Sequence, residues 1–182
     1  MASLNRQQAL ADRVVRLHIL ANSDSEADQA LKLQVRDVIL DRATDILKAS
    51  EDRDEAETVL QAALPELEAL AADKIRAEGW DYDVTAQLTD ARFPTREYDS
   101  FTLPAGDYLA LRIVIGAGAG HNWWCVVFPP LCTQATTDVP AAAMTAGLSQ
   151  DDVDLITEEG RGYVLKFKSI ELWEALKDKL SK

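Results

Sequence analysis

Hydrophobic positions divide the chain into a strand-like run, two long helical stretches and a second half with β-type patterning. Residues 13–20, RVVRLHIL, are rich in β-branched residues and leucine, and they predict a buried strand. Residues 31–47 repeat hydrophobic side chains at helical spacing, and residues 55–77 do the same. We therefore expect one strand and then two helices before the β-rich half begins.

Signals at the ends of these helices refine the prediction. Ser23 and Ser25 each precede an acidic residue by three positions, which is the spacing of a capping box, so the first helix should begin beside one of them. Pro65 lies inside the second helical stretch and predicts a restart or a kink there. Gly79 is expected to end that helix as its C′ residue.

The second half of the chain predicts strands. Residues 82–88 alternate, and residues 96–108 contain a Pro-Ala-Gly turn. Residues 108–115, YLALRIVI, are apolar on both faces and predict a central strand. Residues 122–128, NWWCVVF, are expected to be its neighbour, ended by the two prolines that follow.

The predicted fold class is α+β. An N-terminal strand and two helices should pack on a mainly antiparallel sheet, in a single domain over residues 1–182. Residues 1–12 are interpreted as an N-terminal leader, and residues 134–160 as an irregular excursion. Residues 162–168 predict a late strand, and residues 169–180 predict a closing amphipathic helix.

The charge of the chain narrows the class of partner. The 182 residues carry a formal net charge of −12, which repels phosphate backbones and argues against nucleic acid as a partner. Residues 51–83 hold 3 basic and 11 acidic side chains, and we interpret them as a solvated helical face. The sequence contains no apolar run of the roughly 18 residues that a membrane-spanning helix needs.

The glycine-rich stretch IVIGAGAGHNWW resembles a dinucleotide-binding fingerprint only at first sight. The third glycine position of that motif holds His121, and the next residues are aromatic and β-prone instead of helix-forming. Without a helix N-terminus the loop has no site for a pyrophosphate. Gly116, Gly118 and Gly120 are therefore expected to let a loop turn and pack closely between two antiparallel strands.

Both cysteines of the chain lie within residues 120–132, GHNWWCVVFPPLC. Cys125 and Cys132 could form a disulfide or pack unbridged. Cys125 with His121 or His18 as base could instead serve a cysteine-dependent hydrolase acting on peptide or cell-wall material. The two cysteines and two histidines also match a tetrahedral zinc site by number, which would make a zinc-stabilised binding module. The residues alone leave these four readings open.

Aromatic and polar residues near the same segment are candidates for binding a partner protein. Neighbouring residues of a strand point to opposite faces, so Trp123 and Trp124 are expected on opposite faces of the sheet. If one of the two rings is exposed, it would anchor an interface with a partner protein. The partner-binding candidates are Asn22, Asp24, His121, Asn122, Trp123 and Trp124.

The two segments that carry most of this chemistry, residues 17–29 and 120–132, are expected to lie side by side. His18 and the glycine-rich loop should then share one end of the sheet, because the polar residues of both core strands cluster at one end. Asp28 and Lys32 are four residues apart on a helix and are interpreted as an ordinary surface pair.

Three longer segments resemble a known family. The segments are RLHILANSDSEADQALKLQVRD, FPTREYDSFTLPAGDYLALRIVIGAGAGHNWWCVVFPPLC and LKFKSIELWE, and together they are similar to stage II sporulation protein R of endospore-forming bacteria. The resemblance implies a signalling protein that is made in the forespore and exported into the space between two membranes. It also implies that this protein activates a membrane-bound aspartic protease, stage II sporulation protein GA, which removes the pro-sequence of sporulation sigma factor E.

This resemblance implies an activating ligand without catalytic residues, metal or small-molecule cofactor of its own. It favours the disulfide between Cys125 and Cys132, because the intermembrane space is extracytoplasmic. Family members begin with a membrane or export segment, so residues 1–12 are expected to follow a removed segment, and the protein to work close to a membrane.

Overall fold

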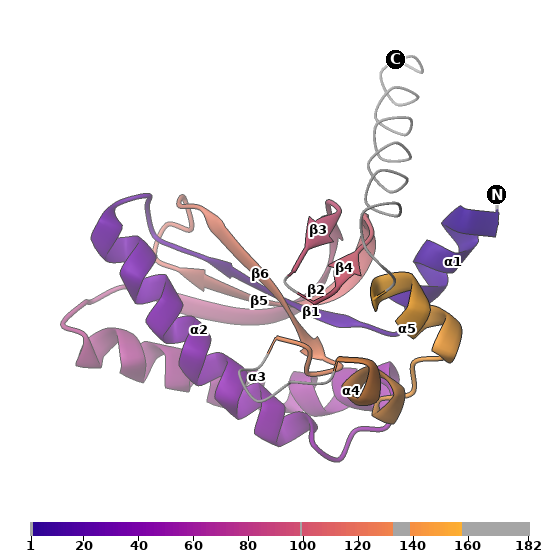
Figure 1. Ribbon diagram of the computed structural model, residues 1–182. Coiled ribbons are helices and arrows are strands. Elements are labelled where there is room, and N and C mark those ends of the chain that lie inside the picture. The colour runs from indigo at the N-terminus through magenta and orange to yellow at the C-terminus, as the bar shows by residue number, and fades with distance from the viewer. Residues whose placement is uncertain (1, 99, 133–138, 158–182) are drawn as a thin grey trace.

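The computed structural model describes residues 2–98, 100–132 and 139–157, which form a four-stranded sheet with two long helices on one face (Figure 1). In chain order the elements are α1 (Ala2–Ala11), β1 (Val15–Leu20), α2 (Glu26–Leu47), α3 (Arg53–Ala77), β2 (Val84–Phe93), β3 (Arg96–Glu97), β4 (Thr102–Leu103), β5 (Gly106–Ile115), β6 (Asn122–Phe128), α4 (Val139–Thr145) and α5 (Gln150–Thr157). The predicted α+β class and the mainly antiparallel sheet are confirmed.

The N-terminal strand β1 lies inside the sheet, whose order is β2-β5-β1-β6. It runs parallel to β5 and antiparallel to β6, while β2 and β5 are antiparallel. The prediction that 122–128 would neighbour 108–115 is therefore wrong, because β1 separates them. The periodicity of a strand reports which of its faces are buried, and it contains no information on which strand lies beside it.

The pairing of β1 with β6 confirms that the two chemically dense segments lie side by side. Leu17 is the register partner of Cys125, and Leu20 is the partner of Asn122. His18 lies two residues before the end of β1, so it is close to the glycine-rich loop that connects β5 to β6. This loop crosses the end of β1, since the two strands that it joins are not adjacent.

Helix α2 begins in the second of the two capping registers. Ser25 is the N-cap, and its side chain accepts a hydrogen bond from the backbone N–H of Asp28. The hydroxyl of Ser23 instead donates to the Asp28 carboxylate at 2.6 Å. Ser23 is thereby part of the turn before the helix, which leaves the capping position to Ser25.

Helix α3 continues through Pro65 as one element, so the expected restart is wrong. Pro65 and Gln61 are both exposed. Proline removes the hydrogen bond to the carbonyl four residues earlier, and on this outer face water can replace the missing donor. The predicted end is confirmed: Gly79 follows the C-cap with a φ of +85°, in the left-handed region that favours glycine.

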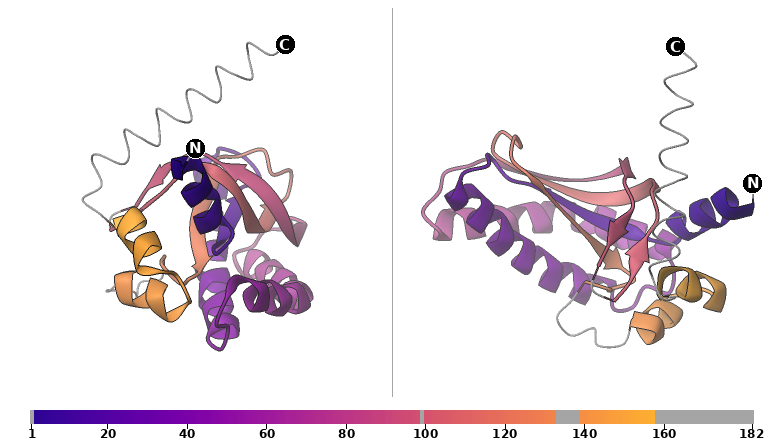
Figure 2. Two further views of the ribbon diagram at one scale, coloured as in Figure 1. Left: turned by 90° about the vertical axis from the view of Figure 1, so that its right-hand side faces the viewer. Right: turned by 45° about the horizontal axis from the view of Figure 1, so that its top comes forward.

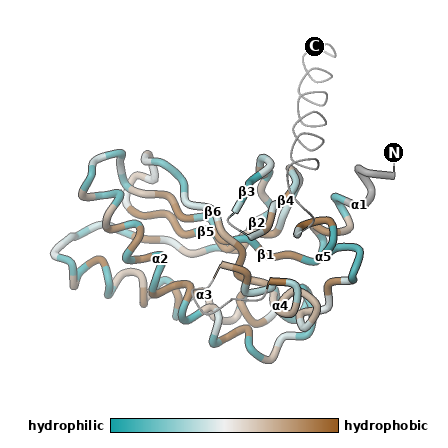
Figure 3. Tube along the Cα trace, in the orientation of Figure 1, coloured by the Kyte–Doolittle hydropathy of each residue, from teal (hydrophilic) through white to brown (hydrophobic). Residues whose placement is uncertain are grey.

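A first core layer of apolar side chains packs between the sheet and helices α2 and α3. Hydrophobic residues recur along these strands and helices in Figure 3. The side chains of this layer include Val15, Leu17 and Ile19 of β1, Leu109, Leu111, Ile113 and Ile115 of β5, Cys125 and Val127 of β6, and Leu31, Val35, Ile39, Leu60, Leu67 and Ile75 of the helices. These positions recur at period two in the strands and at helical spacing in α2 and α3, as the sequence pattern predicts.

A second core layer covers only one end of the opposite face of the sheet. Its side chains come from β2, β5 and β6 of the sheet and from α1, β4, α4 and α5. The elements α1, β3–β4, α4 and α5 gather at this end of the molecule (Figure 2). The side chains of this layer include Leu10, Phe93, Phe101, Leu103, Tyr108, Val126, Val139, Val153 and Ile156. The remainder of this face, beside the glycine-rich loop, consists of half-buried and exposed side chains.

Residues 2–11, within the segment interpreted as a leader, form helix α1, and its Leu10 and Ala11 are buried in the second layer. The irregular path predicted for 134–160 is wrong over 139–157, where apolar residues at helical spacing give α4 and α5. The strand predicted at 162–168 and the helix predicted at 169–180 lie outside the described residues.

Within the described ranges, no helix combines the length and the hydropathy that crossing a bilayer requires.

Replacing Gly120 by alanine is expected to destabilise the fold by about 1–3 kcal/mol, the typical cost of overpacking. An added Cβ would lie 2.2 Å from the backbone carbonyl oxygen of Ser23, which cannot rotate away. Gly106→Ala is the matched control, because its Cβ would meet Tyr108 at an ordinary 3.4 Å. Urea unfolding of both variants measures the difference, and equal stability of the two would contradict the close approach.

Candidate functional site

The turn of residues 21–24 and the glycine-rich loop of residues 116–121 interlock, and we call them the loop–turn junction. The backbone N–H of Gly120 donates to the carbonyl of Ala21 at 3.0 Å, and that of Ala119 donates to the carbonyl of Asn22 at 3.2 Å. Gly116 and Gly118 adopt φ values of +55° and +60°. The expectation of a closely packed glycine loop is confirmed, and the chain continues from it into β6 instead of a helix.

Side chains of the turn hold the loop in place. The Asn22 carbonyl oxygen accepts from the backbone N–H of Ala117 at 2.9 Å. Asp24 accepts from the backbone N–H of His121 at 2.7 Å and also contacts the His121 imidazole. Asn22 and Asp24 therefore both hold the loop through hydrogen bonds, and the side chains of Asp24 and His121 are exposed.

Asp28 and Lys32 connect the start of α2 to this junction. They are 3% and 4% exposed, so their interpretation as an ordinary surface pair is wrong. Asp28 accepts from Ser23 and from Asn22, while the Lys32 ammonium donates to Gln29 at 2.6 Å and to the His121 carbonyl at 3.0 Å. The spacing of four residues did not reveal this, because Asp28 bonds to the turn and Lys32 bonds to the loop.

The pKa values of Asp28 and Lys32 are both lowered, but the main cause differs between the two groups. The hydrogen bonds from Ser23 and Asn22 lower the pKa of Asp28, because they stabilise its charged form. Burial lowers the pKa of Lys32, since desolvation disfavours the ammonium, and the charge of Asp24 opposes this effect. The loop–turn junction thus depends on an ionised carboxylate.

His18 points to the face of the sheet opposite α2 and α3. Its Nε2 lies 2.8 Å from the side-chain oxygen of Asn122, and its ring lies beside Phe93 and Trp124. Burial lowers the pKa of His18, and the hydrogen bond to Asn122 acts against this. The neutral imidazole is therefore the favoured form at neutral pH.

Trp123 and Trp124 point to opposite faces of β6, as predicted. Trp123 packs on the layer under α2, with the Arg36 guanidinium 4.4 Å from its ring centroid. Trp124 packs on the other face, with the Arg96 guanidinium 4.2 Å from its ring centroid. Both rings are half-buried, and an arginine stacks on each of them.

Arg16 is a residue of the site that sequence reasoning missed. It is 0% exposed within β1 and lies over the Phe93 ring at 4.3 Å. Its Nη2 donates to the Tyr98 hydroxyl at 2.5 Å, and its Nε donates to the Cys125 carbonyl at 3.5 Å. A single arginine within an apolar strand was the signal that could have identified it.

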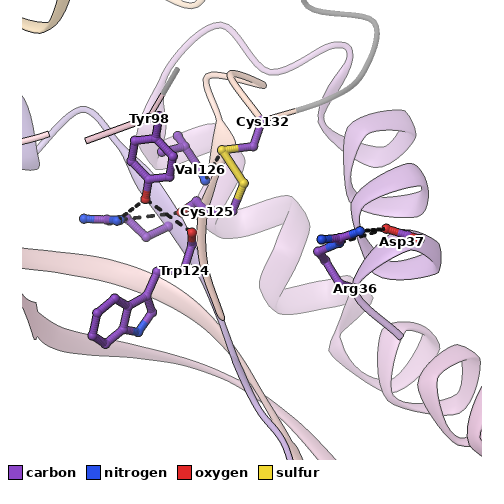
Figure 4. The surroundings of a disulfide bond; sticks show 8 residues. Arg36, Asp37, Tyr98, Trp124, Cys125, Val126 and Cys132 are labelled. Atoms are coloured by element: carbon purple, nitrogen blue, oxygen red, sulfur yellow. Dashed lines mark hydrogen bonds and ion pairs between the residues drawn. A yellow bond between two sulfur atoms is a disulfide. The ribbon is translucent and has the colours of Figure 1, made fainter. Parts of the chain in front are cut away.

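Cys125 and Cys132 are paired across the turn that follows β6 (Figure 4). Their Cα atoms lie 6.0 Å apart, within the range of a disulfide. The backbone N–H of Val126 donates to the Cys132 sulfur at 3.2 Å, and the carbonyl of Trp124 accepts from the Tyr98 hydroxyl at 3.3 Å. These contacts occupy the outer edge of β6, which is the last strand of the sheet among the described residues.

The structure does not assemble the predicted thiol or zinc sites. Cys125 faces the layer under α2, whereas His18 points to the other face of the sheet. His121 precedes Cys125 by four residues of mostly extended chain, or about 13 Å. No cluster of three or more histidine, cysteine, aspartate or glutamate side chains suited to a metal occurs in the described part of the chain.

A groove of about 930 Å³ runs beside Cys125 and Cys132, between α2 and β6. Trp123, Arg36 and three aspartates of α2 are among its lining residues, and the described lining contains no histidine. Neither histidine of the chain is therefore placed to activate Cys125 as a nucleophile.

Asp28→Asn is expected to lower the free energy of unfolding by about 1–2 kcal/mol at pH 7, because it replaces a charged hydrogen-bond acceptor by a neutral one. The folded pKa of Asp28 is lowered. Its contribution is therefore complete above the unfolded pKa of about 3.9, and it is lost as the pH falls through the folded value.

The measurement is urea unfolding at pH 7 and at pH 3, with Asp41→Asn on the exposed side of α2 as control. The stability gap between the parent and Asp28→Asn should shrink at pH 3, while Asp41→Asn should change little at either pH. A gap of the same size at both pH values would show that the ionised carboxylate is not what stabilises the junction.

Comparison with known proteins gives one family. The sequence model described as Stage II sporulation protein R matches residues 11–138. A relative, Stage II sporulation protein R of Bacillus subtilis (strain 168), is 41% identical over 130 residues, which are 71% of this chain and 58% of the relative. No solved structure matches the chain.

Proposed function

The chain belongs to the stage II sporulation protein R family, and from this premise we propose that it is a secreted signalling protein that activates a membrane-bound aspartic protease. The protease is stage II sporulation protein GA, and its activation leads to removal of the pro-sequence of sporulation sigma factor E. The proposed site of action is the space between the forespore and mother-cell membranes. The aligned part covers 58% of the relative's length, so the activity of the whole protein is part of the proposal.

The observation that carries the proposal is the pairing of β1 with β6. The segments with the densest family resemblance come from distant parts of the chain, and this pairing joins them in one continuous region around the loop–turn junction. A rigid sheet that presents exposed loop residues suits recognition of a partner protein. Asp24, His121 and Asn122 are the exposed members of that region among the predicted candidates.

Activation by binding requires differential affinity. A ligand shifts its partner toward an active arrangement only if it binds that arrangement more tightly than the inactive one. The chain would then need no catalytic residue of its own. This agrees with a geometry in which Cys125 lies far from His121 and on the other face from His18.

Single replacement of His121, Asn122, Trp123 or Trp124 by alanine is expected to yield at least one folded variant that no longer activates the protease. Loss of a central interface contact typically weakens binding roughly thirtyfold. Met144→Ala, on α4 and 50% exposed, is the matched surface control. Cleavage of the sigma factor precursor is measured with the protease reconstituted in membranes, and thermal melting confirms folding. Full activation by all four variants would contradict a binding site at this junction.

The double variant Cys125→Ser, Cys132→Ser is expected to lose about 2.5 kcal/mol of stability in the chain-entropy treatment of a short closed loop. Its activation of the protease per folded molecule should be unchanged, because the proposed role of the bridge is structural. Reduction of the parent protein should lower its melting temperature toward that of the variant. Loss of signalling in a fully folded variant, together with peptide or wall hydrolysis by the parent, would favour the cysteine hydrolase instead.

A further inference from the structure

One row of side chains crosses all four strands on the face opposite α2 and α3. Register pairing aligns Gln87 of β2, Arg112 of β5, His18 of β1 and Trp124 of β6. Adjacent strands are about 4.8 Å apart, so the row forms a continuous strip across the sheet. Arg96 extends the strip, since its guanidinium stacks on Trp124 at 4.2 Å.

The rows on either side of this strip contain no carboxylate. The row toward the loop–turn junction includes Asn122 and the apolar, half-buried Leu20 and Val114. The row toward the opposite end contains the buried Arg16, and the remaining positions of both rows are neutral. Cationic groups are therefore concentrated on this face without a neighbouring acid in the sheet.

The opposite side of the molecule has the reverse charge. Residues 51–83, which include α3, hold 11 acidic and 3 basic side chains. The net charge of −12 is thus unevenly distributed, with an acidic helical layer on one side and an arginine-bearing strip on the other. An acidic partner would be repelled from the helical layer and attracted to the strip.

Within the described ranges, the arginines of the strip have no anionic partner. No hydrogen bond or ion pair there involves the guanidinium of Arg112 or of Arg96, and the Arg96 guanidinium stacks on the Trp124 ring. Burial is the main cause of the lowered pKa of His18. The positive charges of Arg112 and Arg16 lower it further, because nearby cations disfavour a protonated imidazole.

We propose that the strip of Arg112, His18, Trp124 and Arg96 is a docking surface for an acidic, partly apolar peptide segment of a partner protein. A carboxylate of that segment pairs with Arg112 and another with Arg96, while an apolar side chain contacts Leu20 and Val114. Arginine suits this role because its planar guanidinium can bind a carboxylate with two hydrogen bonds. The identity of the partner as the protease rests on the proposed function.

The first experiment measures binding of a fluorescent octapeptide of alternating glutamate and leucine, with a lysine–leucine peptide of equal length for comparison. The full chain should bind the acidic peptide, and less tightly as salt is raised, because salt screens the attraction. Arg112→Glu combined with Arg96→Glu should weaken binding at least about tenfold. Arg76→Glu, the same charge reversal on the exposed acidic side of α3, is the matched control and should have little effect.

Several outcomes would overturn the proposal. These are no binding by the parent chain, equal binding of the lysine–leucine peptide, or an equal loss with Arg76→Glu. Binding to vesicles of anionic phospholipid that disappears in the double variant, without peptide binding, would assign the strip to a membrane surface. A change of sedimentation on charge reversal would assign it to a second copy of the chain. If the double variant does not fold, Arg112→Gln with Arg96→Gln gives the same test without introducing a negative charge.

The second experiment separates this inference from the proposed function. The double variant and Arg76→Glu are added to the reconstituted protease, and cleavage of the precursor is followed. Loss of activation only in the double variant supports both the docking surface and the proposed function. Activation by the parent and the double variant alike would disprove the docking surface and leave the function standing. Absence of activation by the parent would refute the function, and the peptide measurement would still decide whether the strip binds acidic segments.

Discussion

The close approach of two backbones at the loop–turn junction is the constraint on which the arrangement of this sheet depends. The loop from β5 must cross the end of β1 to reach the far side, and the carbonyl of Ser23 leaves no room for a side chain at Gly120. Once the loop has crossed, β6 pairs along the whole of β1 and places Trp124 beside His18. Local packing at one turn therefore determines which residues share the open face.

The buried Arg16 connects the four-stranded sheet to the small two-stranded sheet β3–β4. Its guanidinium reaches Tyr98, which follows β3, and a carbonyl of β6, while the faces of Phe93 and Tyr108 cover it. A buried cation without a carboxylate is costly, and hydroxyl, carbonyl and aromatic ring faces replace only part of its hydration. The small β3–β4 sheet is thereby tied to the central strand, which also keeps Arg96 above Trp124.

Most helices and strands of this fold could be predicted from the sequence, but the order of the strands in the sheet could not. Alternation and helical spacing identified β1, β5, β6, α2 and α3, because burial of one face leaves a period in the sequence. The insertion of β1 between β5 and β6 left no such trace. The hydrogen bond from Lys32 to the loop and the pairing of His18 with Arg112 each join residues more than fifty positions apart in the sequence. No local pattern encodes such contacts. The restart expected at Pro65 did not occur, since Pro65 and Gln61 are exposed and water can replace the missing hydrogen bond.

The turn after β6 also affects whether a β-strand of another chain can pair with this edge of the sheet. β6 is an edge strand, and an open edge is a template on which a second β-strand can add, which is a common route to aggregation. Here the Cys132 sulfur accepts the outward N–H of Val126, and the Tyr98 hydroxyl donates to the outward carbonyl of Trp124. Side chains from two other segments thus occupy the hydrogen-bonding positions that an incoming strand would need. A strand adding at β6 would therefore first have to displace the Tyr98 hydroxyl and the Cys132 sulfur from these two positions.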